Sequence, residues 1–233
     1  MSILEVQLIA GRGTEAVKLA PVALAMRTAG LLLPVLVAAG EQLTTVSRAL
    51  AAFELEPDVS IPGGALTDLI RRLDALWAER RPAAVMVQGD GPIGLSGALA
   101  ATWRRIPVLH LSAGVRGDEF ESAPPGGAEG RLIAQVATVH LVPVPIDAMN
   151  LIDEGVAARS VLITGDTGYD AALAIAHRRL PASRAPAVHR YSDGLAGTRA
   201  AQAVAALLGL ADRPAPMPVP ACAGAPNSAT YGV

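Results

Sequence analysis

The chain has 233 residues, of which 52% are hydrophobic and only 3% aromatic, and its 19 basic and 21 acidic residues give a net charge of −2. This balance predicts no nucleic-acid partner and no binding to a membrane. The single cysteine, Cys222, argues against a disulfide framework and a cysteine-based metal site, and no His/Asp cluster has metal spacing. Without a recognisable signal peptide, we expect a cytoplasmic protein.

Short apolar runs alternate with helical patterns along the first 180 residues. Strands are expected at 3–9, 32–38, 84–88, 107–111, 139–143 and 160–163. Helices are expected near 14–28, 41–52, 66–80, 94–104, 127–137, 146–154 and 168–179. The strand runs lack polar alternation, as strands do when helices cover both faces of a sheet. The sequence therefore predicts an α/β fold with a Rossmann-like parallel sheet between two layers of helices, spanning residues 1–180.

The alternating pattern breaks near residue 180. Two prolines make the segment 181–188 a predicted linker, because proline interrupts a helix. A final helix is expected within 189–209, with Asp193 as its N-cap. The remaining segment, 210–233, is rich in proline and alanine, and we expect it to be disordered.

The loop after the first strand has the G-x-G-x-x-A spacing of a dinucleotide-binding turn, with Gly11, Gly13 and Ala16 at the fixed positions. Its amides and the following helix N-terminus suit a phosphate or carboxylate, and Arg12 and Lys18 add positive charge. A dinucleotide site also needs an acid at the end of the second strand, where this sequence ends in alanines and a glycine. NAD binding is therefore the weaker interpretation, and we predict no cofactor.

Two later strand ends carry further candidates, because ligands of parallel sheets bind beyond the carboxyl ends of the strands. Asp90 follows the strand at 84–88 and is either an acid/base group or the N-cap of the next helix. His110 is either a buried core histidine or, together with Arg116, part of a site.

Four segments carry motifs in a recognisable order: GRGTEAVKLAP at 11–21, VMVQGD at 85–90, RIPVLHLSAGVR at 105–116 and ITGDTGYDAA at 163–172. A fifth, HRYSDGLA at 189–196, precedes the final helix. Together they resemble the non-hydrolysing UDP-N-acetylglucosamine 2-epimerases, a family with the two-domain glycosyltransferase-B architecture. The resemblance implies a single N-terminal-type domain, with the final helix packed back on it and most of the second domain absent.

The resemblance also implies a ligand, a nucleotide sugar or a related small molecule, and a set of site residues. Asp90 and His110 become the catalytic candidates. The substrate-binding candidates are Gly11, Arg12, Gly13, Lys18, Arg116, Glu129 and Arg131.

The sequence departs from the family pattern at several acids and bases. Ser112 stands where the family has a glutamate, Gly13 where it has an arginine, and Gly126 and Gly127 where it has glutamates. We therefore do not expect this chain alone to epimerise UDP-N-acetylglucosamine, although a homo-oligomer could supply the missing wall of a cleft. The alternative is a non-catalytic homologue that binds a fuller sugar-nucleotide enzyme.

Overall fold

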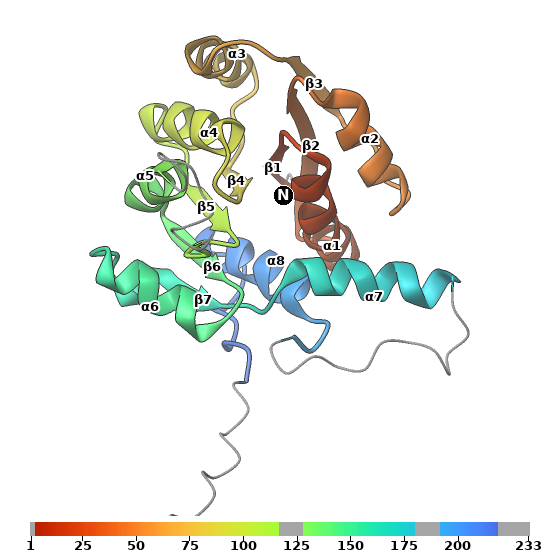
Figure 1. The fold of residues 1–233 in the computed structure, drawn as a ribbon, viewed down its shortest axis with the longest axis vertical. Helices are drawn as coiled ribbons and strands as arrows, with labels where there is room; N and C mark the ends of the chain where they lie inside the picture. The colour runs from red at the N-terminus through yellow and green to blue at the C-terminus, as the bar shows by residue number, and fades with distance from the viewer. Residues whose placement is uncertain (1–2, 117–127, 180–191, 219–233) are drawn as a thin grey trace, which may run out of the picture.

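The computed structural model describes residues 3–116, 128–179 and 192–218. These residues form a seven-stranded sheet in the order β3-β2-β1-β4-β5-β6-β7, in which every neighbouring pair is parallel (Figure 1). The strands are β1 (Leu4–Ala10), β2 (Leu32–Gly40), β3 (Val59–Pro62), β4 (Ala84–Gln88), β5 (Val108–Leu111), β6 (Val139–Val142) and β7 (Val161–Ile163). The predicted Rossmann-like parallel sheet is confirmed.

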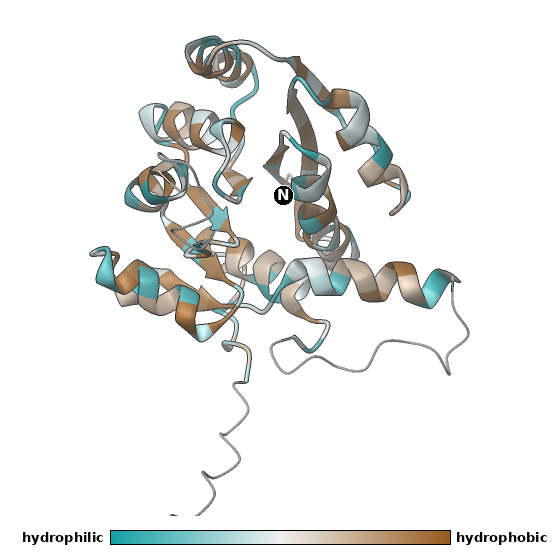
Figure 2. Ribbon diagram, in the orientation of Figure 1, coloured by the Kyte–Doolittle hydropathy of each residue, from teal (hydrophilic) through white to brown (hydrophobic). Residues whose placement is uncertain are grey.

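Helices cover both faces of the sheet. They are α1 (Gly13–Ala29), α2 (Leu43–Ala51), α3 (Leu66–Glu79), α4 (Pro92–Trp103), α5 (Ala128–Val136), α6 (Pro145–Asp153), α7 (Thr167–Arg179) and α8 (Ala196–Leu207). Alternate side chains of one strand pack on opposite faces of the sheet. Leu8 of β1 belongs to the core formed with α1, α2, α7 and α8, whereas Ile9 belongs to the core formed with α3, α4 and α5. This two-sided burial explains the continuous apolar strands, which Figure 2 shows in brown.

Strand β3 was not predicted. It has four residues, pairs only with β2 at the sheet edge, and ends in Pro62. Within it only Ile61 is fully buried, so it offers neither a continuous apolar run nor a long alternation. A short edge strand that ends in proline leaves little signal in the sequence.

Helix α8 packs against α1 with very small side chains. A Cβ on Gly197 would lie 2.8 Å from the carbonyl carbon of Pro21, so the two backbones approach too closely for any other residue. The prediction that Asp193 is the N-cap is wrong, because α8 begins at Ala196 after Leu195. Instead, Asp193 forms an ion pair with Arg199 one turn into the helix.

The N-terminus of α8 is capped from another helix. Asp170 of α7 accepts a hydrogen bond from the Gly197 amide at 2.8 Å, and the Asp170 carboxylate is almost fully buried. Burial raises the pKa of Asp170 above its ordinary value. The segment 180–191, which contains the predicted linker, lies outside the described residues.

Part of the predicted disordered tail is ordered. In the described portion, Arg213 donates hydrogen bonds to the carbonyls of Val161 and Arg159, and the Met217 amide donates to Ile163 at 2.8 Å. The bonds to Val161 and Ile163 engage backbone carbonyls of the edge strand β7, and the bond to Arg159 engages the segment before it, so Arg213 and Met217 are held against the fold. Residues 219–233 lie outside the described residues. None of the helices in the described parts of the chain is long and apolar enough to cross a membrane.

Candidate functional site

The charged candidates converge on a small cavity at the carboxyl ends of β4 and β5. This β4–β5 cavity has a volume of about 110 Å³. Its lining residues are Lys18, Gln88, Gly89, Asp90, His110, Ser112, Val115, Arg116 and Gly130. They come from α1, β4, β5, α5 and the segments that follow the two strands, so the parallel sheet brings together residues more than 100 positions apart in the chain.

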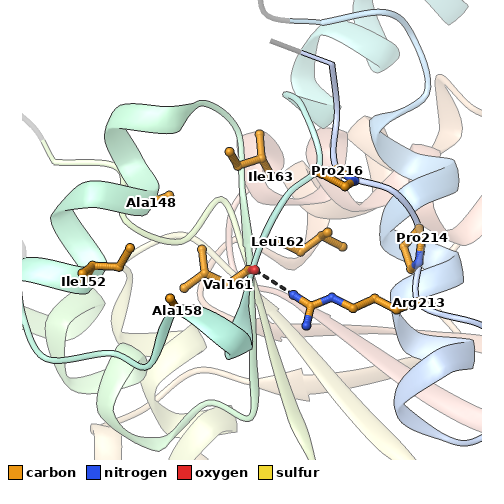
Figure 3. Close-up of a pocket in the computed structure, with 9 residues that line it drawn as sticks. All are labelled: Ala148, Ile152, Ala158, Val161, Leu162, Ile163, Arg213, Pro214 and Pro216. Carbon is orange, nitrogen blue, oxygen red and sulfur yellow. Dashed lines mark hydrogen bonds between the residues drawn. The ribbon is translucent and has the colours of Figure 1, made fainter.

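A larger cavity of about 450 Å³ lies beside β7 (Figure 3). Its lining is hydrocarbon apart from Arg213, whose guanidinium bonds the carbonyl of Val161. A cavity without other side-chain donors or acceptors offers little for recognition of a polar ligand. The β4–β5 cavity is therefore the better site candidate, although it is smaller.

Asp90 is not the N-cap of α4, because that position belongs to Gly91. Its carboxylate is 58% exposed and lies 3.8 Å from Nη2 of Arg12. Of the two interpretations open from the sequence, the cap is thus excluded. Among the described residues that line the cavity, Asp90 is the only carboxylate.

His110 lines the cavity but is itself buried. Its Nε2 lies 2.7 Å from the carbonyl oxygen of Gly89, which can only accept, so Nε2 carries the hydrogen. Burial lowers the pKa of His110 to about 4, and burial lowers that of the neighbouring His140 to about 4 as well. His110 is therefore neutral at pH 7 and holds the turn that carries Asp90.

Ser112 follows β5 in a left-handed backbone conformation, with φ of 57°. Such a conformation is unfavourable for a residue with a side chain and is often retained at functional sites. Ser112 is nearly buried and lines the cavity beside Arg116. Sequence reasoning treated it only as a lost glutamate, because backbone strain leaves no mark in the sequence.

Arg116 is fixed by an acid that sequence reasoning missed. Its Nε and Nη2 donate to the two oxygens of Glu154 at 2.9 and 2.6 Å, and Nε of Arg131 lies 3.4 Å from the same carboxylate. The hydrogen bond from Arg116 lowers the pKa of Glu154. Glu154 follows α6, 38 positions after Arg116, and no local pattern in the sequence connects them.

The glycines of the first loop are required for packing. A Cβ on Gly11 would lie 2.3 Å from Cγ1 of Ile93, and one on Gly13 would lie 2.9 Å from Cγ2 of Thr45. The amides of Gly11 and Arg12 donate to the carboxylate of Glu15 at 2.7 and 3.2 Å. Two of the amides expected to hold an anion thus already have an internal partner.

Lys18 is the only lysine among the 19 basic residues of the chain. It lines the cavity from α1 and also approaches the start of α7, where a Cβ on Gly168 would lie 3.4 Å from its Cε. Of the sequence-predicted site residues, Lys18, Asp90, His110 and Arg116 line the cavity. Gly11, Arg12, Gly13, Glu129 and Arg131 are not part of that lining, and Gly126 and Gly127 lie outside the described residues.

The described residues contain no group of three or more His, Cys, Asp or Glu side chains able to hold a metal ion. The described lining of the cavity offers two cations and one exposed carboxylate. Lys18 and Arg116 can hold an anion by charge and hydrogen bonds, and Asp90 can accept or donate a proton.

Comparison with known proteins places the chain in a family. The family model for UDP-N-acetylglucosamine 2-epimerase matches residues 35–208. The UDP-N-acetylglucosamine 2-epimerase of Escherichia coli K12 is 32% identical over 178 residues, which are 73% of this chain and 47% of that protein. The chain thus spans about half the length of the curated relatives it matches.

Solved structures show the same likeness. The Neisseria meningitidis UDP-GlcNAc 2-epimerase bound to UDP-GlcNAc is 27% identical with a TM-score of 0.69, over 77% of this chain and 51% of that one. The S. aureus protein MnaA, in a co-structure with UDP, is 28% identical with a TM-score of 0.68, over 72% of this chain and 46% of that one. By the extent of the family match, the chain belongs to the UDP-N-acetylglucosamine 2-epimerase family.

Proposed function

We propose that this chain binds a nucleotide sugar at the β4–β5 cavity, with a UDP-sugar as the ligand. The observation that carries the proposal is the convergence of the only lysine, Lys18, with Arg116 and Asp90 at the carboxyl ends of β4 and β5. The N. meningitidis relative is bound to UDP-GlcNAc, which supports this class of ligand. In this arrangement the two cations attract the diphosphate, and Asp90 faces the sugar.

The size of the cavity defines how much of the ligand it encloses. Pockets that enclose a small-molecule ligand usually measure about 300–1,000 Å³, whereas the β4–β5 cavity measures about 110 Å³. It accommodates a phosphate or part of a sugar ring, and the rest of the ligand extends beyond it. A second copy of the chain or a partner protein would cover that remainder.

We propose binding rather than catalysis because one proton-transfer group is not enough for epimerisation. Inverting the carbon at sugar position 2 needs a base on one face and an acid on the other. Asp90 is the only carboxylate of the described lining, His110 is neutral with Nε2 engaged, and Ser112 does not ionise at neutral pH. These groups favour, as the second candidate function, a non-catalytic homologue that acts with a fuller sugar-nucleotide enzyme.

The lysine provides a direct test of binding. Reductive methylation with ¹³C-formaldehyde keeps the charge of Lys18 and gives one lysine methyl signal, which NMR follows during titration with UDP, UDP-N-acetylglucosamine or NAD. We expect a saturable shift with both uridine ligands and none with NAD. In a thermal-shift assay, a ligand at 100 times its Kd stabilises the fold by about 2.7 kcal/mol.

Matched variants separate specific from general charge effects. Lys18→Met should abolish the stabilisation by UDP, whereas Arg71→Met should leave it unchanged, because Arg71 is an exposed cation on α3 away from the cavity lining. A response to NAD alone would contradict the proposal. Exchange of the sugar C2 proton in D₂O that is lost in Asp90→Asn would instead show that the chain catalyses proton transfer, and would exclude the non-catalytic candidate.

A further inference from the structure

Arg116 and Arg131 share one carboxylate beside the β4–β5 cavity. Arg116 takes both oxygens of Glu154 in a forked pair, and its side chain is only 18% exposed. Arg131, from α5, is 58% exposed and reaches the same carboxylate at 3.4 Å. Glu154 is thus the point at which the segment after β5, helix α5 and the end of α6 meet.

Other bonds hold the same junction. Asn150 of α6 donates to the carbonyl of Gly114 at 2.9 Å, and Nη1 of Arg116 donates to the carbonyl of Val115 at 2.9 Å. Gln135 of α5 donates to the Glu154 carbonyl at 3.3 Å. The position of Arg116 at the cavity wall is therefore set from α5 and α6, and Glu154 makes the only charged contact in this set of bonds.

We propose that Glu154 is a positioning residue for the nucleotide-sugar ligand, which it serves by fixing the guanidinium of Arg116 at the cavity wall. This inference rests on the proposed function. The forked pair uses Nε and Nη2, and Nη1 donates to the carbonyl of Val115, which leaves the second hydrogens of Nη1 and Nη2 available to a ligand at the cavity that Arg116 lines. An arginine oriented in this way loses less conformational freedom when it binds a phosphate than one that moves freely.

The sign of the effect on affinity distinguishes this role from simple electrostatics. Removing the negative charge of Glu154 makes the cavity more positive, and Coulomb's law alone then predicts tighter binding of an anion. Loss of a positioning residue predicts weaker binding, because Arg116 is no longer held in place. The two effects have opposite directions, so one measurement decides between them.

The test measures the Kd for UDP by calorimetry in Glu154→Gln, Glu154→Asp and the unaltered chain. We expect Glu154→Gln to raise the Kd about tenfold. Glu154→Asp keeps the charge but shortens the side chain, so it should also raise the Kd. In ¹⁵N spectra, the Nε–H signal of Arg116 should lose its protection from exchange in Glu154→Gln, with or without UDP.

A matched control lies between α3 and α4. Arg104 forms a similar forked pair with Asp74, with Nη2 to Oδ2 at 3.0 Å, and neither residue lines the cavity. Asp74→Asn should change the Kd less than twofold, and the melting temperatures of all variants show whether they are folded.

Three outcomes are possible, and each decides something. Weaker binding in both Glu154 variants that fold, with Asp74→Asn unchanged, supports the inference. Unchanged or tighter binding in either folded Glu154 variant, or an equal loss in Asp74→Asn, overturns it and leaves the proposed function intact. If the unaltered chain binds neither UDP nor UDP-N-acetylglucosamine, the proposed function fails, and the positioning role falls with it even where the Arg116 signal changes.

Discussion

Helix α1 takes part in two regions of different chemistry, the charged β4–β5 cavity and the apolar contact with α8. Lys18 lines the β4–β5 cavity, and Pro21, one turn later, lies against Gly197 of α8. At the α1–α8 contact the buried side chains are small and apolar, whereas the cavity gathers charged groups around Arg116 and Asp90. In this chain, therefore, closely spaced glycines indicate close packing, whereas charged side chains indicate the candidate site.

The first loop shows why this distinction matters. Its glycine pattern resembles a cofactor fingerprint, yet Gly11 and Gly13 leave room for Ile93 and Thr45. Glu15 takes the two neighbouring amides. A glycine motif can therefore belong to the packing region even when it lies at the edge of a site.

The largest effect on stability is expected at the contact between α1 and α8. In Gly197→Ala the new methyl group would meet the backbone of Pro21 at 2.8–2.9 Å, so the two helices must separate. We expect the free energy of unfolding to fall by about 2–3 kcal/mol, as for other overpacked sites. Urea denaturation followed by circular dichroism measures this change, and UDP binding by the folded fraction should persist.

The matched control is Gly94→Ala in α4. There the new Cβ would lie 3.4 Å from the carbonyl oxygen of Gln88, which is an ordinary contact, and alanine favours a helix over glycine. We expect no loss of stability. Equal losses in Gly94→Ala and Gly197→Ala would mean that the close approach of α8 to α1 is not the cause.

The second prediction concerns the buried histidines beside the cavity. Burial lowers the pKa of His110 and His140 from 6.5 to about 4 in the folded protein. Between these values the unfolded chain binds protons that the folded protein does not, so stability is full above pH 6.5 and falls as the pH drops towards 4. From pH 7 to 5 each histidine should remove about 2 kcal/mol.

Comparison of variants isolates this effect from the carboxylates. The pKa values of Asp147 and Asp170 are raised by burial and act in the opposite direction over part of the same range. His140→Leu removes one histidine and leaves those acids, so the loss of stability between pH 7 and 5 should be about 2 kcal/mol smaller. An identical pH dependence in both proteins would show that His140 is not held neutral.

The sequence was sufficient for the features that depend on neighbours along the chain. Continuous apolar runs predicted β1 and β4 closely because helices cover both faces of the sheet, and helical spacing predicted α3 closely because one of its faces is buried. The sequence predicted that the strands run parallel but not their order in the sheet, and it did not predict the short edge strand β3. The proline- and alanine-rich composition of residues 210–218 predicted disorder, because composition does not reveal that Arg213 bonds the carbonyl of Val161 in β7.

The candidate site divides in the same way. Asp90 was found because it follows β4, and His110 because it lies near the end of β5, at the edge of the sheet where the carboxyl ends of both strands meet. Glu154 was not found, since it lies 38 positions after Arg116 and only the fold brings the two together. Lys18 was found from the charge of the first loop and Arg116 from its place after β5 beside His110, but the role of Glu154 in holding Arg116 required the structure.

The smallest effect compares backbone strain at the cavity with backbone strain elsewhere in the fold. Ser112 and Glu54 are both held at positive φ, 57° and 60°, but only Ser112 lines the cavity. Glycine relieves this conformation, so Ser112→Gly and Glu54→Gly should each raise the free energy of unfolding by about 0.5–1 kcal/mol.

Ser112→Gly should also weaken UDP binding measured by calorimetry, because it removes a hydroxyl from the cavity and frees the segment that leads to Arg116. Glu54→Gly should leave the Kd unchanged. If Ser112→Gly gains stability and binds UDP as before, the strain at Ser112 belongs to the fold alone, and the contrast between the two regions is reduced to their charges.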